Sequence, residues 1–119
     1  MESVARTKSF SFALKTIELY KYLVAEHKEY VLSKQILRSG TSVGALLKES
    51  EHAQSKSDFL HKVNIALKEA NETEYWLELL KTSGYISENK HITLLQDISE
   101  LIKILSAIVK TTKKNLGKL

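Results

Sequence analysis

The sequence contains no cysteine and no proline, and only four glycines among its 119 residues. Without cysteine, the chain cannot form disulfide scaffolds, cysteine-ligated zinc sites, iron–sulfur centres or thiol active sites. The absence of proline permits long uninterrupted helices. Long apolar runs are also missing, because the most apolar stretch, residues 101–109, is interrupted by Lys103 and is too short to span a bilayer. We therefore expect one soluble domain over residues 1–119.

Acidic residues are absent from the last part of the chain. The formal net charge is +4, yet the first hundred residues hold 13 basic and 14 acidic groups. The excess of positive charge follows Glu100 and consists of Lys103, Lys110, Lys113, Lys114 and Lys118. A local basic excess suggests an acidic partner such as nucleic acid. The alternative is a lysine-rich last turn that only complements a helix dipole.

The spacing of apolar residues predicts four helices and no strand, so the fold class is all-α, an antiparallel up-down four-helix bundle. The expected bounds are about 10–27, 31–53, 56–83 and 88–115. The first helix is expected to bury the stripe Phe10, Leu14, Ile17, Tyr20 and Val24, with Leu19 and Leu23 widening this face.

The third helix has the clearest pattern. Ser55 and Asp58 have the spacing of a capping box, and Gly84 is well placed to follow the helix end. Its apolar stripe is expected at Phe59, Val63, Ala66, Ala70, Thr73, Leu77 and Leu80. The second helix is expected to bury Leu32, Ile36, Ser39, Val43, Leu46 or Leu47, and Ser50.

The fourth helix carries two neighbouring apolar stripes, which is more than one face of a monomeric bundle requires. The stripes meet at Ile98 and Leu105. Such a helix is either deeply buried or presents a second face to another subunit. Together with Trp76, outside the main stripe of the third helix, this width predicts self-association into a homo-oligomer.

Small and polar residues occupy the middle of the second helix. Gly40 and Gly44 lie on one face, where the absence of side chains lets a neighbouring backbone come close. A second, polar face is expected to pair with carboxylates of the third helix and to fix helix register. This predicted polar seam consists of Arg38, Ser42, Glu49, Glu69 and Glu72.

Catalytic and metal-binding patterns are weak throughout. The four histidines form no pair at a four-residue helical step, and neither His-Glu-x-x-His nor a phosphate-binding glycine loop occurs. We therefore expect no catalytic residue, no metal and no cofactor. The candidate nucleic-acid-binding residues are Lys34, Arg38, Lys103, Lys110 and Lys114.

Four stretches of the chain resemble a known family, the four-helix-bundle proteins encoded by intervening sequences in bacterial 23S ribosomal RNA genes. The stretches are QILRSGTSVGA (35–45), QSKSDF (54–59), IALKEA (65–70) and ETEYWL (72–77). The residues that match the family motif are Gln35, Arg38, Ser42 and Glu49. Leu46 stands where the family usually has asparagine, and Leu37 stands where many members have a second arginine.

The resemblance implies an antiparallel bundle that assembles as a barrel-like homopentamer. It also implies binding to RNA or a nucleoprotein, as in the similar accessory bundles of diversity-generating retroelements. The amino terminus shows no targeting segment, so a cytoplasmic location is expected. The alternative function is a protein-interaction scaffold with no direct nucleic-acid contact.

Overall fold

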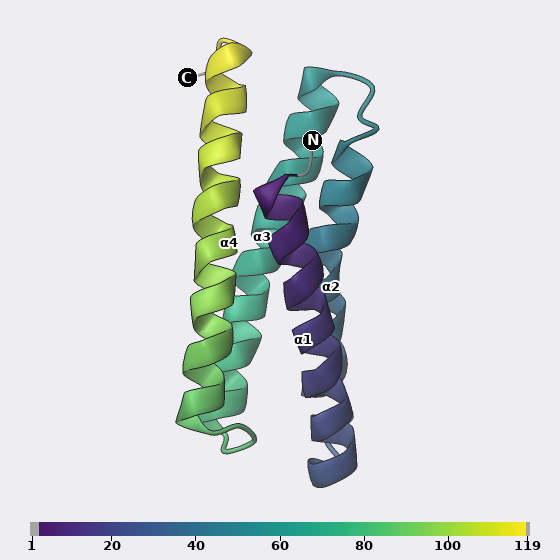
Figure 1. Ribbon diagram of the computed structural model, residues 1–119, viewed down its shortest axis with the longest axis vertical. Helices are drawn as coiled ribbons and strands as arrows, with labels where there is room; N and C mark the ends of the chain where they lie inside the picture. Colours follow the sequence, from purple (N-terminus) through teal and green to yellow (C-terminus); the bar gives the residue numbers. More distant parts are fainter. Residues whose placement is uncertain (1–2, 119) are drawn as a thin grey trace.

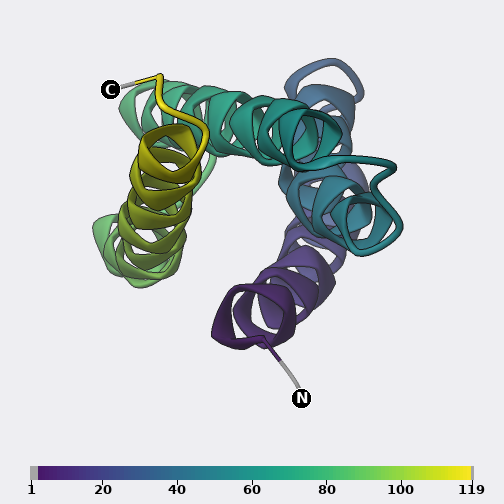
Figure 2. The same cartoon turned by 90° about the horizontal axis from the view of Figure 1, so that it is seen from above.

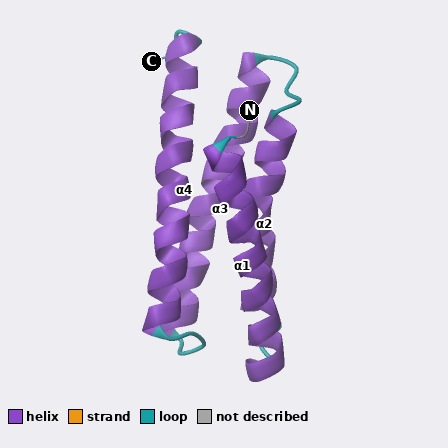
Figure 3. Cartoon of the chain, viewed as in Figure 1, coloured by secondary structure: helices purple, strands orange, loops and turns teal. Residues whose placement is uncertain are grey.

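The computed structural model describes residues 3–118, which form four antiparallel helices joined by short connections (Figures 1 and 3). The helices are α1 (Val4–His27), α2 (Leu32–Ser50), α3 (Lys56–Thr82) and α4 (Glu88–Asn115). The molecule is a rod of 48 × 24 × 22 Å. The predicted all-α up-down bundle is confirmed. None of the helices described is long and apolar enough to cross a membrane.

Three of the four helices begin at a serine cap. The Oγ atom of Ser55 accepts a hydrogen bond from the Asp58 N–H at 3.0 Å, and Ser87 does the same for Lys90 at 3.1 Å. The first helix begins six residues before the predicted start because Ser3 accepts from the Arg6 N–H at 3.2 Å. Each cap satisfies a backbone donor that the first helical turn leaves free.

The second helix is capped from the preceding connection. Lys28 ends α1 in the left-handed region (φ 50°), and Glu29 then accepts from the backbone N–H of Ser33 at 2.7 Å and of Val31 at 3.3 Å. Partial burial opposes ionisation of Glu29, but these backbone donors outweigh it and hold the pKa of the carboxyl below its ordinary value. The Glu29 carboxylate thus stabilises the tight connection between α1 and α2, which contains no glycine or proline.

The apolar stripes of α2, α3 and α4 face one shared core. In α2 and α3 the buried residues follow the predicted stripes closely, although Phe59 is half-buried and Leu60 takes its place inside. The buried face of α4 draws on both of its predicted stripes. Its members are His91, Leu94, Ile98, Leu101, Leu105, Val109 and Thr112.

The predicted core stripe of α1 is wrong. Phe10 is 67% exposed and Leu14 is 52% exposed, while Ile17, Tyr20 and Val24 are half-buried. The buried face of α1 consists instead of Ala5, Ser9, Phe12, Thr16, Leu19 and Leu23. Because this face includes the polar residues Ser9 and Thr16, its apolar pattern in the sequence is weaker than that of the predicted stripe.

The two glycines of α2 explain which face of α1 turns inward. A Cβ atom on Gly40 would lie 2.7 Å from the Oγ1 and Cγ2 atoms of Thr16, and one on Gly44 would lie 3.3 Å from the Oγ of Ser9. The glycines therefore meet the small residues of α1, and larger side chains do not fit between the two helices.

Viewed from above, the four helices form a U, with α1 and α4 as its two arms (Figure 2). These two helices share the smallest of the four helix–helix interfaces. Two ion pairs cross this edge, Lys8–Glu100 at 2.9 Å and Lys15–Asp97 at 2.6 Å. The α1–α4 edge is thus the least extensive of the four, and two ion pairs cross it.

We predict that Gly40→Ala destabilises the protein by about 1–3 kcal/mol, because the new methyl group overlaps Thr16. Thr16 is buried and its hydroxyl donates to the Phe12 carbonyl at 2.9 Å, so the side chain cannot rotate away freely. Gly44→Ala is the matched control, since the contact there is looser and alanine favours the helix by about 1 kcal/mol. Thermal unfolding of both variants measures the difference. Equal stability of the two would contradict the close contact at Gly40.

Candidate functional site

Arg38 lies between two carboxylates of α3. Its Nη1 atom donates to both oxygens of Glu69, at 3.1 and 3.0 Å, and its Nη2 atom donates to Glu72. Glu72 also accepts from the indole Nε1 of Trp76 at 3.1 Å, and Gln35 accepts from the Arg38 Nε at 3.4 Å. We call Gln35, Arg38, Glu69, Glu72 and Trp76 the arginine seam. It joins α2 to α3 along the outside of the bundle.

The arginine seam favours the charged forms of Arg38 and Glu72. The hydrogen bonds to Glu69, aided by the charges of both carboxylates, raise the pKa of Arg38 above its ordinary value against a small cost of burial. Burial by itself raises the pKa of Glu72, but the hydrogen bond from Trp76 and the charge and hydrogen bond of Arg38 lower it overall. The Arg38 side chain is 48% exposed, yet its guanidinium already donates to two carboxylates.

Two members of the predicted polar seam do not join it. The Ser42 hydroxyl donates to the Arg38 carbonyl of its own helix at 2.6 Å and not to a carboxylate of α3. Glu49 pairs instead with Lys62 at 3.4 Å. Lys62 lies about two helical turns before Glu69, so this pair is separate from the carboxylates that hold Arg38. Trp76, in contrast, belongs to the seam through its indole, because its position four residues after Glu72 brings the two side chains together.

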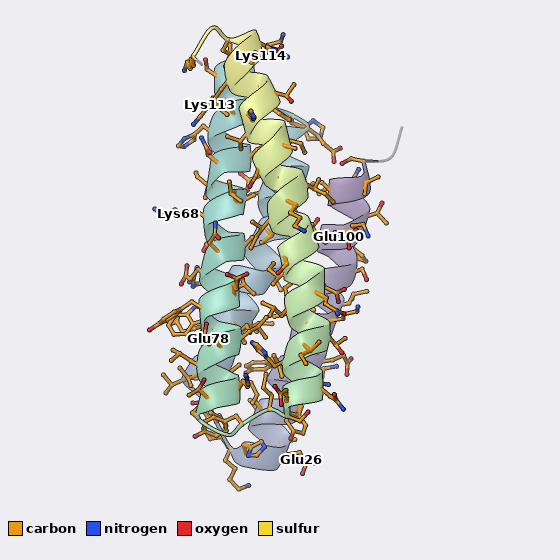
Figure 4. The ribbon with its side chains drawn as sticks, turned by 90° about the vertical axis from the view of Figure 1, so that its left-hand side faces the viewer. Glu26, Lys68, Glu78, Glu100, Lys113 and Lys114 are labelled. Atoms are coloured by element: carbon orange, nitrogen blue, oxygen red, sulfur yellow. The ribbon has the colours of Figure 1, made fainter. Side chains whose placement is uncertain are left out.

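The candidate nucleic-acid-binding residues lie toward opposite ends of the rod. Lys34 and Arg38 occupy the first half of α2, whereas Lys103, Lys110 and Lys114 occupy the second half of α4. Figure 4 shows Lys113 and Lys114 at one end of the molecule and Glu26 at the other. Because neighbouring helices are antiparallel, the structure does not combine the five predicted residues into one patch.

The end of the bundle at which α4 finishes carries several lysine side chains that form no ion pair within residues 3–118. No ion pair within residues 3–118 involves Lys103, Lys110, Lys113, Lys114 or Lys118, whereas Lys8, Lys15, Lys62 and Lys81 all have carboxylate partners. Lys56, the first residue of α3, lies at this same end. Lys56 is not among the residues predicted from the sequence, although an up-down topology places the start of the third helix beside the end of the fourth. We call Lys56, Lys110, Lys113, Lys114 and Lys118 the lysine end.

The described residues contain no group of three or more histidine, aspartate or glutamate side chains that could hold a metal ion. His91 is buried in the core, and the other three histidines are exposed on separate helices and connections.

Comparison with known proteins agrees with this fold. The family model described as 23S rRNA-intervening sequence protein matches residues 1–107. A crystal structure from Bacteroides thetaiotaomicron, described as a protein with unknown function from the S23 ribosomal protein family, shares 55% sequence identity with a TM-score of 0.89. The similarity covers 90% of this chain and 99% of that one. No curated protein matches this chain. The family match ends before Lys110, so most of the lysine end lies outside it.

We predict that Arg38→Gln lowers the free energy of unfolding by about 1–2 kcal/mol, because it leaves Glu69 and Glu72 adjacent without their cation. Arg38→Lys is expected to recover only part of this loss, since an ammonium cannot hold both carboxylates in the same fork. Lys62→Gln, which breaks one exposed pair, is the control and is expected to cost less than about 1 kcal/mol. Urea unfolding compares the three variants. An Arg38→Gln protein as stable as Lys62→Gln would show that the seam adds nothing.

The seam also predicts a pH dependence. Glu72 has a lowered pKa in the folded chain, so its contribution to stability is complete above its unfolded pKa of about 4.3 and is lost as the pH falls through its folded value. The stability difference between the wild type and Arg38→Gln is therefore expected to be constant above about pH 5 and to shrink below it. Urea unfolding between pH 7 and 3 measures this difference, and a gap that widened on acidification would contradict the predicted ionisation of Glu72.

Proposed function

Since this chain belongs to the 23S rRNA-intervening sequence protein family, we propose that it is a non-enzymatic helical bundle that associates with copies of itself and binds RNA or a nucleoprotein. The observation that carries the proposal is the lysine end. Its positive charges lie at one tip of a rod whose remaining charges are nearly balanced, and none of them has an ion-pair partner in residues 3–118.

Lysine side chains suit contact with phosphates more than reading of bases. An ammonium group is a strongly hydrated point charge without the planar fork that recognises guanine. Phosphate contacts release counterions, so they give affinity that depends on salt and little on sequence. The structure supports this mode over base recognition, because Arg38, one of two arginines in the chain, is held by Glu69 and Glu72.

Self-association would multiply the charge. One lysine end offers a modest positive field, and several parallel copies would gather their lysine ends at one tip of the assembly. In the pentamer that the resemblance implies, five such ends would form a surface broad enough to follow an RNA backbone. Oligomeric state and nucleic-acid binding are therefore linked in this proposal.

A protein-interaction scaffold is the alternative. It is favoured by Tyr75, which is 57% exposed and stacks edge-on against Trp76 at a centroid distance of 5.3 Å. An exposed aromatic side chain of this kind is typical of contact surfaces between proteins. One binding experiment distinguishes the two functions. The RNA-binding proposal expects the purified protein to bind a mixed single-stranded RNA at low salt, and the scaffold expects no binding.

We predict that Lys110→Gln/Lys113→Gln/Lys114→Gln weakens binding to a 20-nucleotide RNA and reduces the slope of log affinity against log salt by about 2, because about 0.7 is lost for each phosphate contact. Lys28→Gln/Lys81→Gln/Lys90→Gln removes the same charge from the opposite end and serves as the control, with an unchanged slope expected. Fluorescence anisotropy between 50 and 300 mM salt is the measurement. If both variants lose the same slope, the lysine end is not the binding surface, and absence of binding by the wild type favours the scaffold.

A further inference from the structure

A groove lies between α1 and α2, and neither the core nor the arginine seam fills it. It has a volume of about 490 Å³, which is within the range of small-molecule sites. The residues that line it include Phe10 and Ala13 of α1 and Gly44 and Ala45 of α2. We call it the Phe10 groove.

The walls of the Phe10 groove differ in shape. On one side is the aromatic ring of Phe10, which is 67% exposed. On the other side, Gly44 and Ala45 contribute no side chain and a single methyl group, so the surface of α2 is shallow there. The groove therefore has room for a second planar ring to stack on Phe10.

The charge of the Phe10 groove is positive. The charged side chains that line it, among the residues described, are Arg6 and Lys48. Arg6 is already held by Glu51, whose carboxylate lies 2.9 Å from its Nε and accepts from its Nη1 at 3.2 Å. Lys48 takes part in no ion pair within residues 3–118. The groove thus suits a ligand that joins an aromatic ring to a negative charge, with Lys48 as the cation free to meet it.

The Phe10 groove and the lysine end lie toward the same end of the rod. Because neighbouring helices are antiparallel, α1 begins and α2 ends where α3 begins and α4 ends (Figure 1). Phe10 lies in the first third of α1, and Lys48 lies in the last turn of α2. The rod is 24 × 22 Å across, so one nucleic-acid strand can reach both surfaces.

We propose that the Phe10 groove holds one unpaired nucleotide of a single-stranded nucleic acid. Its base stacks on Phe10, an adjacent phosphate lies at Lys48, and phosphates further along the strand contact the lysine end. This inference rests on the proposed nucleic-acid binding and names the form of the strand.

Stacking uses the face of a base and not its edge, so it adds affinity without reading sequence. A paired base inside a duplex is covered by its neighbours and reaches the groove only if it is first unstacked. The groove therefore adds affinity for single strands, whereas the lysine end attracts the phosphates of single strands and duplexes alike.

Phe10→Leu tests this inference, because it keeps an apolar side chain and removes the aromatic ring. The position is exposed, so the helical content is expected to be unchanged. We expect binding to a 20-nucleotide single-stranded RNA to weaken about five-fold or more, and binding to an RNA duplex of the same length to be unchanged. Phe10→Trp keeps an aromatic face and is expected to bind the single strand at least as tightly as the wild type. Fluorescence anisotropy at low salt measures each affinity.

Tyr75→Leu is the matched control, because it removes an aromatic side chain that is 57% exposed on α3, outside the groove. It is expected to bind the single strand like the wild type. If Phe10→Leu also does so, or if Phe10→Trp loses as much affinity as Phe10→Leu, this inference is wrong while the proposed binding stands. An equal loss for single strand and duplex would show that Phe10 acts through assembly and would overturn stacking. A wild type that binds neither RNA would overturn both proposals.

Discussion

The close approach of α1 to α2 at Thr16 and Gly40 is the constraint on which the rest of the arrangement depends. Because a Cβ atom on Gly40 would overlap the threonine side chain, only a small residue on each helix permits this distance. The contact turns the face of α1 that contains Ser9 and Thr16 toward the core. It therefore also turns Phe10 and Leu14 outward and leaves the groove beside them. One steric fact thus determines both what is buried and what remains for another molecule.

Electrostatic pairing divides the surface into two kinds of region. Along the arginine seam, and on the edge between α1 and α4, the charges of neighbouring helices are neutralised by direct contact. At the lysine end, charges project without partners in residues 3–118. Ion-paired side chains help to set the register of the helices, whereas unpaired lysines attract molecules of opposite charge from solution. The proposed nucleic-acid-binding surface, the lysine end, belongs to the second kind.

Helix existence, order and most approximate ends followed from apolar spacing, capping residues and Gly84, because each of these signals is local, whereas the start of α1 lies six residues before its predicted position. The face of α1 did not, since both of its stripes repeat at the same steps and the more apolar one is outside. Only the contact with a distant glycine distinguishes them. For the seam, helical spacing indicated that Arg38 could reach Glu69 and Glu72, but the departure of Glu49 toward Lys62 depends on the crossing of α2 and α3, which no single helix encodes.

The weak edge of the U has a consequence for how the chain folds. Three of the four helix interfaces in the described chain join helices that follow one another, so those contacts form over short loops at little entropic cost. The α1–α4 edge alone joins segments some eighty residues apart, as Lys15 and Asp97 are. It closes last and opens first, and its two ion pairs weaken as salt rises. Ionic strength therefore changes how firmly α1 and α4 stay joined, while α1 remains packed on α2 through the contact of Thr16 with Gly40.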